Sequence, residues 1–217
     1  MKKLLLATVL AMAAMTLGAQ AQSDQGRKGT GFFDVGLGYY NFSPDEGKAR
    51  DLGGVFLSGG WYVSNKSRLS LDIGVYLSEG DKVGWFHYTS GGTTKTDGVI
   101  KLGHTIVPIT VSWNFEFKIS KKAYFRVGPS VGGTVISSSF SFDPSNVKNK
   151  PKLKGETSTT FSYGGSAGFA WDVARRSNIY VGYRFLGNTE GEMKTSDGIY
   201  KTKSTSHQVM ATYGWRF

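Results

Sequence analysis

The chain has 217 residues, no cysteine and a net charge of +10, and these values exclude several classes of protein. Without cysteine it cannot be a lipid-anchored lipoprotein, a disulfide-stapled domain or a thiolate metal site. The 30 glycines argue against a helical fold. Basic proteins often bind nucleic acid, but most lysines of this chain lie in turn and loop segments, so we expect no nucleic-acid partner.

Residues 1–21 are predicted to be a cleaved signal peptide. Two lysines at positions 2 and 3 precede the apolar run 4–17, which is too short and wrongly flanked for a stable transmembrane helix. Small residues at positions 19 and 21 place the cleavage site after Ala21. The mature chain, residues 22–217, suits one domain. The alternative is an uncleaved anchor helix.

The mature chain alternates apolar and polar residues with period 2, which predicts β-strands. Eight such runs follow one another: about 31–42, 52–64, 68–79, 98–117, 123–140, 157–172, 178–187 and 203–217. The run 68–79 is the clearest, because its odd positions from Leu69 to Leu77 are all aliphatic. The sequence therefore predicts an all-β fold.

The connections between these runs alternate in length. The short ones lie near 65–66, 118–122 and 173–177, and the long ones at about 43–51, 79–97, 141–156 and 188–202. Short turns at one rim and long loops at the other are typical of outer-membrane barrels. We therefore predict an eight-stranded antiparallel up-and-down transmembrane β-barrel with extracellular loops and periplasmic termini.

The composition of the two strand faces indicates which one contacts lipid. The polar face consists of Gly, Ser, Tyr and isolated charges, so it suits a tightly filled interior better than a water-facing surface. The apolar face carries aromatic residues expected near the two membrane interfaces: Phe33, Trp61, Trp113, Phe115, Phe125, Trp171, Trp215 and Phe217 at one, and Tyr39, Phe161, Tyr163 and Phe185 at the other. The alternatives are a soluble lipocalin-type barrel and a β-sandwich.

The last run ends with Tyr213, Trp215 and Phe217 at alternate positions. This pattern resembles the sorting signal of outer-membrane barrels, which implies recognition by the barrel assembly machinery during insertion. Over residues 22–217 the chain is similar to the OmpA/OmpX-like family of eight-stranded barrels. The resemblance implies an integral protein of a bacterial outer membrane, in contact with its lipid and lipopolysaccharide, and we expect it to be a monomer.

Several charged residues fall on the face predicted to be the interior. We expect a network in which Arg126 and Arg184 pair with Asp34 and Asp72, because an isolated buried charge is costly. Glu116 and Arg216 lie in the same phase, as do these bulky aromatic residues: Phe32, Tyr40, Phe56, Tyr62, Tyr76, Tyr124 and Tyr180. The network would plug the lumen, so we expect no open pore; a gate or proton path is the alternative.

No catalytic residues, metal site or cofactor are predicted. Ser206 and His207 are adjacent near the outer rim, and some lipid A deacylases and palmitoyltransferases are also eight-stranded barrels. However, the pair lacks the His-x-Ser spacing of the deacylase motif, and only Glu190 and Glu192 could supply an acid. No His, Asp or Glu cluster has metal-ligand spacing. We therefore expect that the protein is not an enzyme.

The long connections carry the remaining candidate contacts. Lys148, Lys150, Lys152 and Lys154 crowd one of them and could contact phosphates or another polyanion, although an ordinary solvated loop fits equally well. Trp85, Phe86 and Tyr88 lie in another, where they could pack on a strand extension or form a recognition patch. The predicted function is structural or surface interaction, by adhesion or lipopolysaccharide contact. The alternatives are a narrow channel for small hydrophobic molecules or ions and a lipid A-modifying enzyme.

Overall fold

The computed structural model describes residues 27–45, 49–78, 81–90, 94–143, 157–195 and 198–217. Within them the chain forms nine strands: β1 (Gly31–Pro44), β2 (Arg50–Ser64), β3 (Ser67–Leu77), β4 (Asp81–Ser90), β5 (Thr94–Lys118), β6 (Ala123–Asp143), β7 (Thr157–Asp172), β8 (Ser177–Thr195) and β9 (Gly198–Arg216). The predicted signal peptide and the four lysines at 148–154 lie outside the described residues. No helix in the described part is long and apolar enough to cross a membrane.

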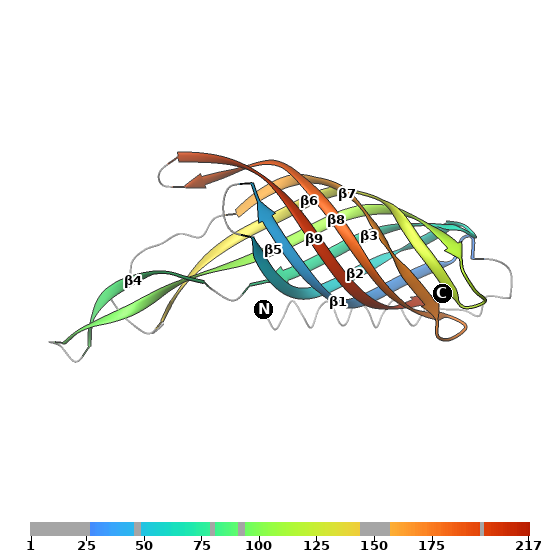
Figure 1. Cartoon of the computed structure of the whole chain (residues 1–217), viewed down its shortest axis with the longest axis horizontal. Coiled ribbons are helices and arrows are strands. Elements are labelled where there is room, and N and C mark those ends of the chain that lie inside the picture. Colours follow the sequence, from blue (N-terminus) through green and yellow to red (C-terminus); the bar gives the residue numbers. More distant parts are fainter. Residues whose placement is uncertain (1–26, 46–48, 79–80, 91–93, 144–156, 196–197) are drawn as a thin grey trace.

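Eight of these strands form a closed antiparallel barrel, as the alternation predicts (Figure 1). Each barrel strand pairs with its neighbours in the sequence, β1 pairs with β9, and β3 pairs with β5 across the hairpin that contains β4. Three short connections, at Asn65-Lys66, 119–122 and 173–176, lie at one end, which we call the turn end. Here the chain also enters β1 and leaves β9.

Two segments predicted to be loops are paired strands. Within 79–97, β4 pairs with the first part of β5, from Asp81 opposite Leu102 to Ser90 opposite Thr94, and this hairpin extends well beyond the barrel (Figure 1). Within 188–202, β8 and β9 continue to pair as far as Thr195 opposite Gly198. The residues of β4 include Val, Trp, Phe, Tyr and Thr, which favour strands, and a hairpin pairs backbone groups that a loop would leave to water.

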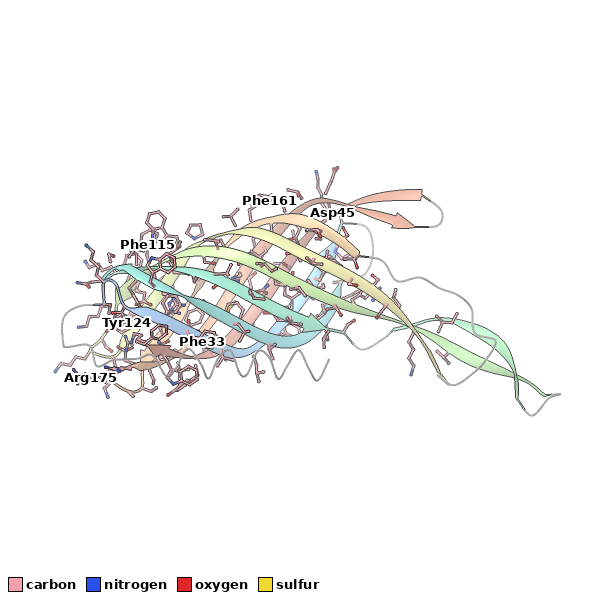
Figure 2. All side chains as sticks on the ribbon, turned by 180° about the vertical axis from the view of Figure 1, so that it is seen from behind. Phe33, Asp45, Phe115, Tyr124, Phe161 and Arg175 are labelled. Atoms are coloured by element: carbon pink, nitrogen blue, oxygen red, sulfur yellow. The ribbon has the colours of Figure 1, made fainter. Side chains whose placement is uncertain are left out.

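Even-numbered residues point into the barrel in every barrel strand, and odd-numbered residues point outward. The outward face is apolar and carries exposed aromatic side chains at both ends. Figure 2 shows Phe33 and Phe115 near the turn end and Phe161 toward the other end. Phe33 and Phe125 are half-buried, whereas Trp61, Trp113, Trp171 and Trp215 are exposed. This arrangement matches the lipid-facing surface that the sequence predicts.

Inward glycines allow the strands of this small barrel to approach closely. A Cβ atom on Gly36 would lie 2.0 Å from the carbonyl oxygen of Ala211, and one on Gly128 would lie 2.1 Å from that of Trp113. Neither glycine has a positive φ, so close approach of the backbone is what requires them.

Candidate functional site

Two layers of side chains fill the lumen. The layer nearer the turn end, called here the charged layer, consists of Asp34, Arg68, Asp72, Glu116, Arg126 and Arg184, and each of these residues is at most 4% exposed. The layer farther from the turn end, called the apolar layer, consists of Tyr40, Phe42, Leu52, Tyr76, Ile106 and Ile136. All twelve residues have even numbers, so the alternation of side chains along each strand is enough to point them into the lumen.

Asp72 and Arg184 form an ion pair across the lumen, from β3 to β8. Arg184 Nη2 donates a hydrogen bond to Asp72 Oδ2. The same carboxylate accepts hydrogen bonds from Ser58 Oγ at 2.6 Å and from Ser112 Oγ at 2.5 Å. Three hydrogen bonds therefore reach one buried carboxylate, and together they offset the free-energy cost of removing its charge from water.

Asp34 and Arg126 lie near each other, but their main partners differ from those predicted. Arg68 Nη2 donates to Asp34 Oδ2 at 2.5 Å, whereas Arg126 Nη1 is 4.0 Å from that oxygen. Arg126 instead donates through Nε and Nη2 to Glu116 Oε1, at 3.0 and 2.8 Å. The predicted network omits Arg68 and Glu116 as partners. Both residues have even numbers, like Asp72, so the strand alternation predicts that their side chains point into the lumen.

Arg27 closes the turn end of the lumen. It precedes β1 and donates to Glu116 Oε2 at 2.5 Å and to Asp172 Oδ2 at 2.9 Å, while its guanidinium lies 4.0 Å from the centre of the Tyr124 ring. Burial lowers the pKa of Arg27, but the negative charges of Glu116 and Asp172 contribute to holding it above its usual value. Arg216 Nη2 contacts the other Asp172 oxygen at 3.0 Å. No strand pattern precedes β1, so the sequence carries no signal for Arg27.

The charged layer packs against a second apolar group formed by Phe56, Tyr180 and Met210 with Ala170. The guanidinium of Arg126 lies 4.5 Å from the centre of the Tyr180 ring, and that of Arg184 lies 5.1 Å from the centre of the Phe56 ring. A cavity of about 20 Å³ lies between these side chains, which is room for about one water molecule. Its size suits a structural water and not a passage for solutes.

Ser206 and His207 lie on opposite faces of β9. Ser206 is fully buried and its Oγ donates to the carbonyl oxygen of Leu186, whereas the ring of His207 faces outward between those of Tyr183 and Phe185. His207 Nδ1 shares a hydrogen bond with the Tyr183 hydroxyl. The structure therefore does not bring a serine nucleophile and a histidine base together at this position.

The other predicted site residues lie outside the lumen network. Tyr213, Trp215 and Phe217 are exposed on the outer face at the turn end, where the Tyr213 and Trp215 rings are 4.6 Å apart. Trp85, Phe86 and Tyr88 belong to β4, in the hairpin that extends from the opposite end of the barrel. Among the residues that the structure describes, no group of three His, Asp or Glu side chains could hold a metal ion.

Comparisons with known proteins agree with this architecture. The family model described as outer membrane protein beta-barrel domain matches residues 7–217. The structure of Neisserial surface protein A (NspA) is similar with 15% identity and a TM-score of 0.55, covering 86% of this chain and 97% of that chain. The structure of Ail, the attachment invasion locus protein of Yersinia pestis, is similar with 14% identity and a TM-score of 0.54, covering 88% of this chain and 99% of that chain.

No curated protein sequence matches the chain. The structural likenesses show the fold, and the family model covers nearly all of the sequence. The chain therefore belongs to the family of outer membrane protein beta-barrel domains and is an integral protein of the outer membrane.

Proposed function

We propose that the protein acts at the cell surface, through the segments that extend beyond the membrane, and not as an open pore. The observation that carries this proposal is the filled lumen. Ion pairs and aromatic rings occupy it in two successive layers, and the cavity beside the charged layer measures about 20 Å³. With the interior occupied, the surface opposite the turn end is the part of the barrel that can meet a ligand outside the cell.

Two features of that surface support a role in binding. The hairpin of β4 and β5 projects from the barrel and has three aromatic residues in its sequence, Trp85, Phe86 and Tyr88, and aromatic residues are enriched in protein interaction sites. The connection between β6 and β7 carries Lys148, Lys150, Lys152 and Lys154. Ail, which has the same fold, has been solved in complex with the heparin analogue sucrose octasulfate. We therefore assign the ligand to the polyanions, such as a sulfated glycan or lipopolysaccharide phosphate.

Binding of fluorescent heparin to intact cells tests this proposal. Replacing Lys148, Lys150, Lys152 and Lys154 with glutamine gives the loop-lysine variant, which should bind about tenfold more weakly, because four charge contacts of a few tenths of a kcal/mol each approach that factor. The matched control, the rim-lysine variant, replaces Lys66, Lys118, Lys121 and Lys122 with glutamine. It removes the same charge at the turn end, away from the outer surface, and should bind as the parent does.

A second variant tests the hairpin. Replacing Trp85–Val99 with Asn-Gly would join the paired residues Gly84 and Ile100 by a tight turn. Insertion should stay normal, because the barrel strands lose only the pairing of Val99 with Asp143 at the end of β6, while heparin binding per inserted molecule should fall. Equal heparin binding by the parent, loop-lysine and hairpin proteins, at equal surface levels, would contradict the proposed function.

The alternative functions have less support in the structure. A narrow passage would need a route past the Asp72–Arg184 pair and past the Tyr40 and Tyr76 rings, whose centres are 4.7 Å apart. A lipid A-modifying enzyme would need a nucleophile and a base together near the outer leaflet, and Ser206 and His207 face opposite sides of β9.

A further inference from the structure

Positive charge is concentrated at the turn end of the barrel. Four segments lie there, 27–30, 65–66, 119–122 and 173–176, and they contain seven basic residues and no acidic residue. The exposed cations at this end, which we call the basic rim, are Lys28, Lys66, Lys118, Lys121, Lys122 and Arg175. Figure 2 shows Arg175 at this tip of the barrel, beyond Phe115.

Two carboxylates near the basic rim, Glu116 and Asp172, are engaged inside the mouth of the barrel. Glu116 is buried and accepts hydrogen bonds from Arg27 and Arg126. Asp172 is paired with Arg27 and with Arg216. Both carboxylates are therefore already paired, and the exposed lysines of the rim make this end of the protein a positively charged surface.

The basic rim also lies at a defined depth relative to the membrane. Exposed tryptophans surround the barrel within a few residues of the turns: Trp61, Trp113, Trp171 and Trp215. Tryptophan prefers the headgroup layer, where its ring is partly in an apolar and partly in a polar environment. Lysines just beyond such a girdle reach the layer of lipid phosphates, because their flexible stems carry the charge toward water.

We propose that the basic rim binds the headgroups of anionic phospholipids in the inner leaflet of the outer membrane. In outer-membrane barrels the short turns face the periplasm, which places the rim against that leaflet. A zwitterionic headgroup carries its own cation beside the phosphate, whereas an anionic headgroup keeps a net charge that the lysines can attract. Each lysine near such a surface adds to the attraction, which salt weakens. This inference is independent of the ligand proposed for the outer surface.

The tryptophans of the protein can report which lipids surround the rim. Four of the five tryptophans lie beside it, and Trp85→Phe removes the one in the β4 hairpin. The Trp85→Phe protein would be inserted into phosphatidylcholine vesicles that contain the same fraction of either brominated phosphatidylglycerol or brominated phosphatidylcholine. Bromine quenches tryptophan fluorescence only at short range, so the ratio of the two quenching efficiencies gives the local enrichment of the anionic lipid.

We expect brominated phosphatidylglycerol to be enriched about threefold at the rim in low salt, and the enrichment to disappear at high salt, where charges are screened within a few ångströms. The rim-lysine variant should lose most of the enrichment. The loop-lysine variant, which removes the same charge at the other end, should keep it. Insertion of each variant is checked by the mobility of unheated protein in SDS, since a closed barrel resists the detergent.

Two results would overturn the proposal. Equal quenching by the two brominated lipids in the Trp85→Phe protein would show that the rim does not select anionic lipid, and would leave an acidic periplasmic protein as its partner. Equal loss of enrichment in the rim-lysine and loop-lysine variants would show that net charge, and not the position of the lysines at the rim, attracts the lipid.

Discussion

Replacing Arg184 with leucine should lower the free energy of unfolding by about 3–5 kcal/mol. The change leaves the Asp72 carboxylate buried without the cation that pairs with it. Ser58 and Ser112 still donate hydrogen bonds to it, but neutral donors compensate only part of the cost of a buried charge. Urea unfolding of the protein in lipid vesicles, followed by tryptophan fluorescence, would measure the loss.

A second change separates the ion pair from general damage to the barrel. Combining Arg184→Leu with Asp72→Asn removes both charges, so the double variant should be more stable than the sum of the two single changes predicts, by about 0.5–3 kcal/mol. Lys203→Leu is the surface control, because Lys203 and Glu190 form an exposed pair 3.7 Å apart, and it should change the free energy by less than about 1 kcal/mol. If the changes in the free energy of unfolding caused by Arg184→Leu and Asp72→Asn simply add in the double variant, the proposed ion pair is contradicted.

Glu116→Gln should produce a loss of similar size, about 3 kcal/mol. Glu116 accepts hydrogen bonds from both Arg27 and Arg126, and after the change the nearest carboxylate oxygen to Arg126 is that of Asp34, 4.0 Å away. The change also weakens the contact that holds the segment before β1 over the mouth of the barrel. Unfolding in urea would measure the first effect, and the rate of trypsin cleavage after Arg27 and Lys28 would measure the second.

Asp172→Asn is the matched control for Glu116→Gln. Arg27 would keep its contact with Glu116, and the Asp172 side chain is 20% exposed, so we expect a loss of about 1 kcal/mol and little added cleavage. If the two variants unfold at the same urea concentration and are cleaved at the same rate, Glu116 does not have the central role assigned to it here.

The barrel could be predicted from the sequence because its strands keep one phase from end to end. Even-numbered residues lie opposite even-numbered residues in neighbouring barrel strands. Residues such as Asp34, Asp72 and Arg184 therefore point inward although they belong to different strands. The same alternation separates lipid-facing residues, such as Trp113, from those of the lumen. Period 2 thus predicts which side chains share the interior.

The pairing inside the lumen could not be predicted in full, because it depends on the distances between strands that are far apart in the sequence. Arg68 lies at the start of β3 and reaches Asp34 of β1. Arg126, which lies 4.0 Å from Asp34, instead donates hydrogen bonds to Glu116 on the neighbouring strand. Arg27 lies outside any alternating run, so no pattern places it in the mouth of the barrel. The hairpin of β4 was missed because its glycine-rich surroundings are typical of loops.

The most direct test of a closed lumen is a planar-bilayer recording of the purified protein. The Asp72–Arg184 pair and the rings of Tyr40 and Tyr76, whose centres are 4.7 Å apart, obstruct the lumen, so we expect no discrete current steps over hours of recording at high protein density. Steady single-channel steps that are absent from a mock preparation made without the gene would contradict the closed lumen and favour a transport function.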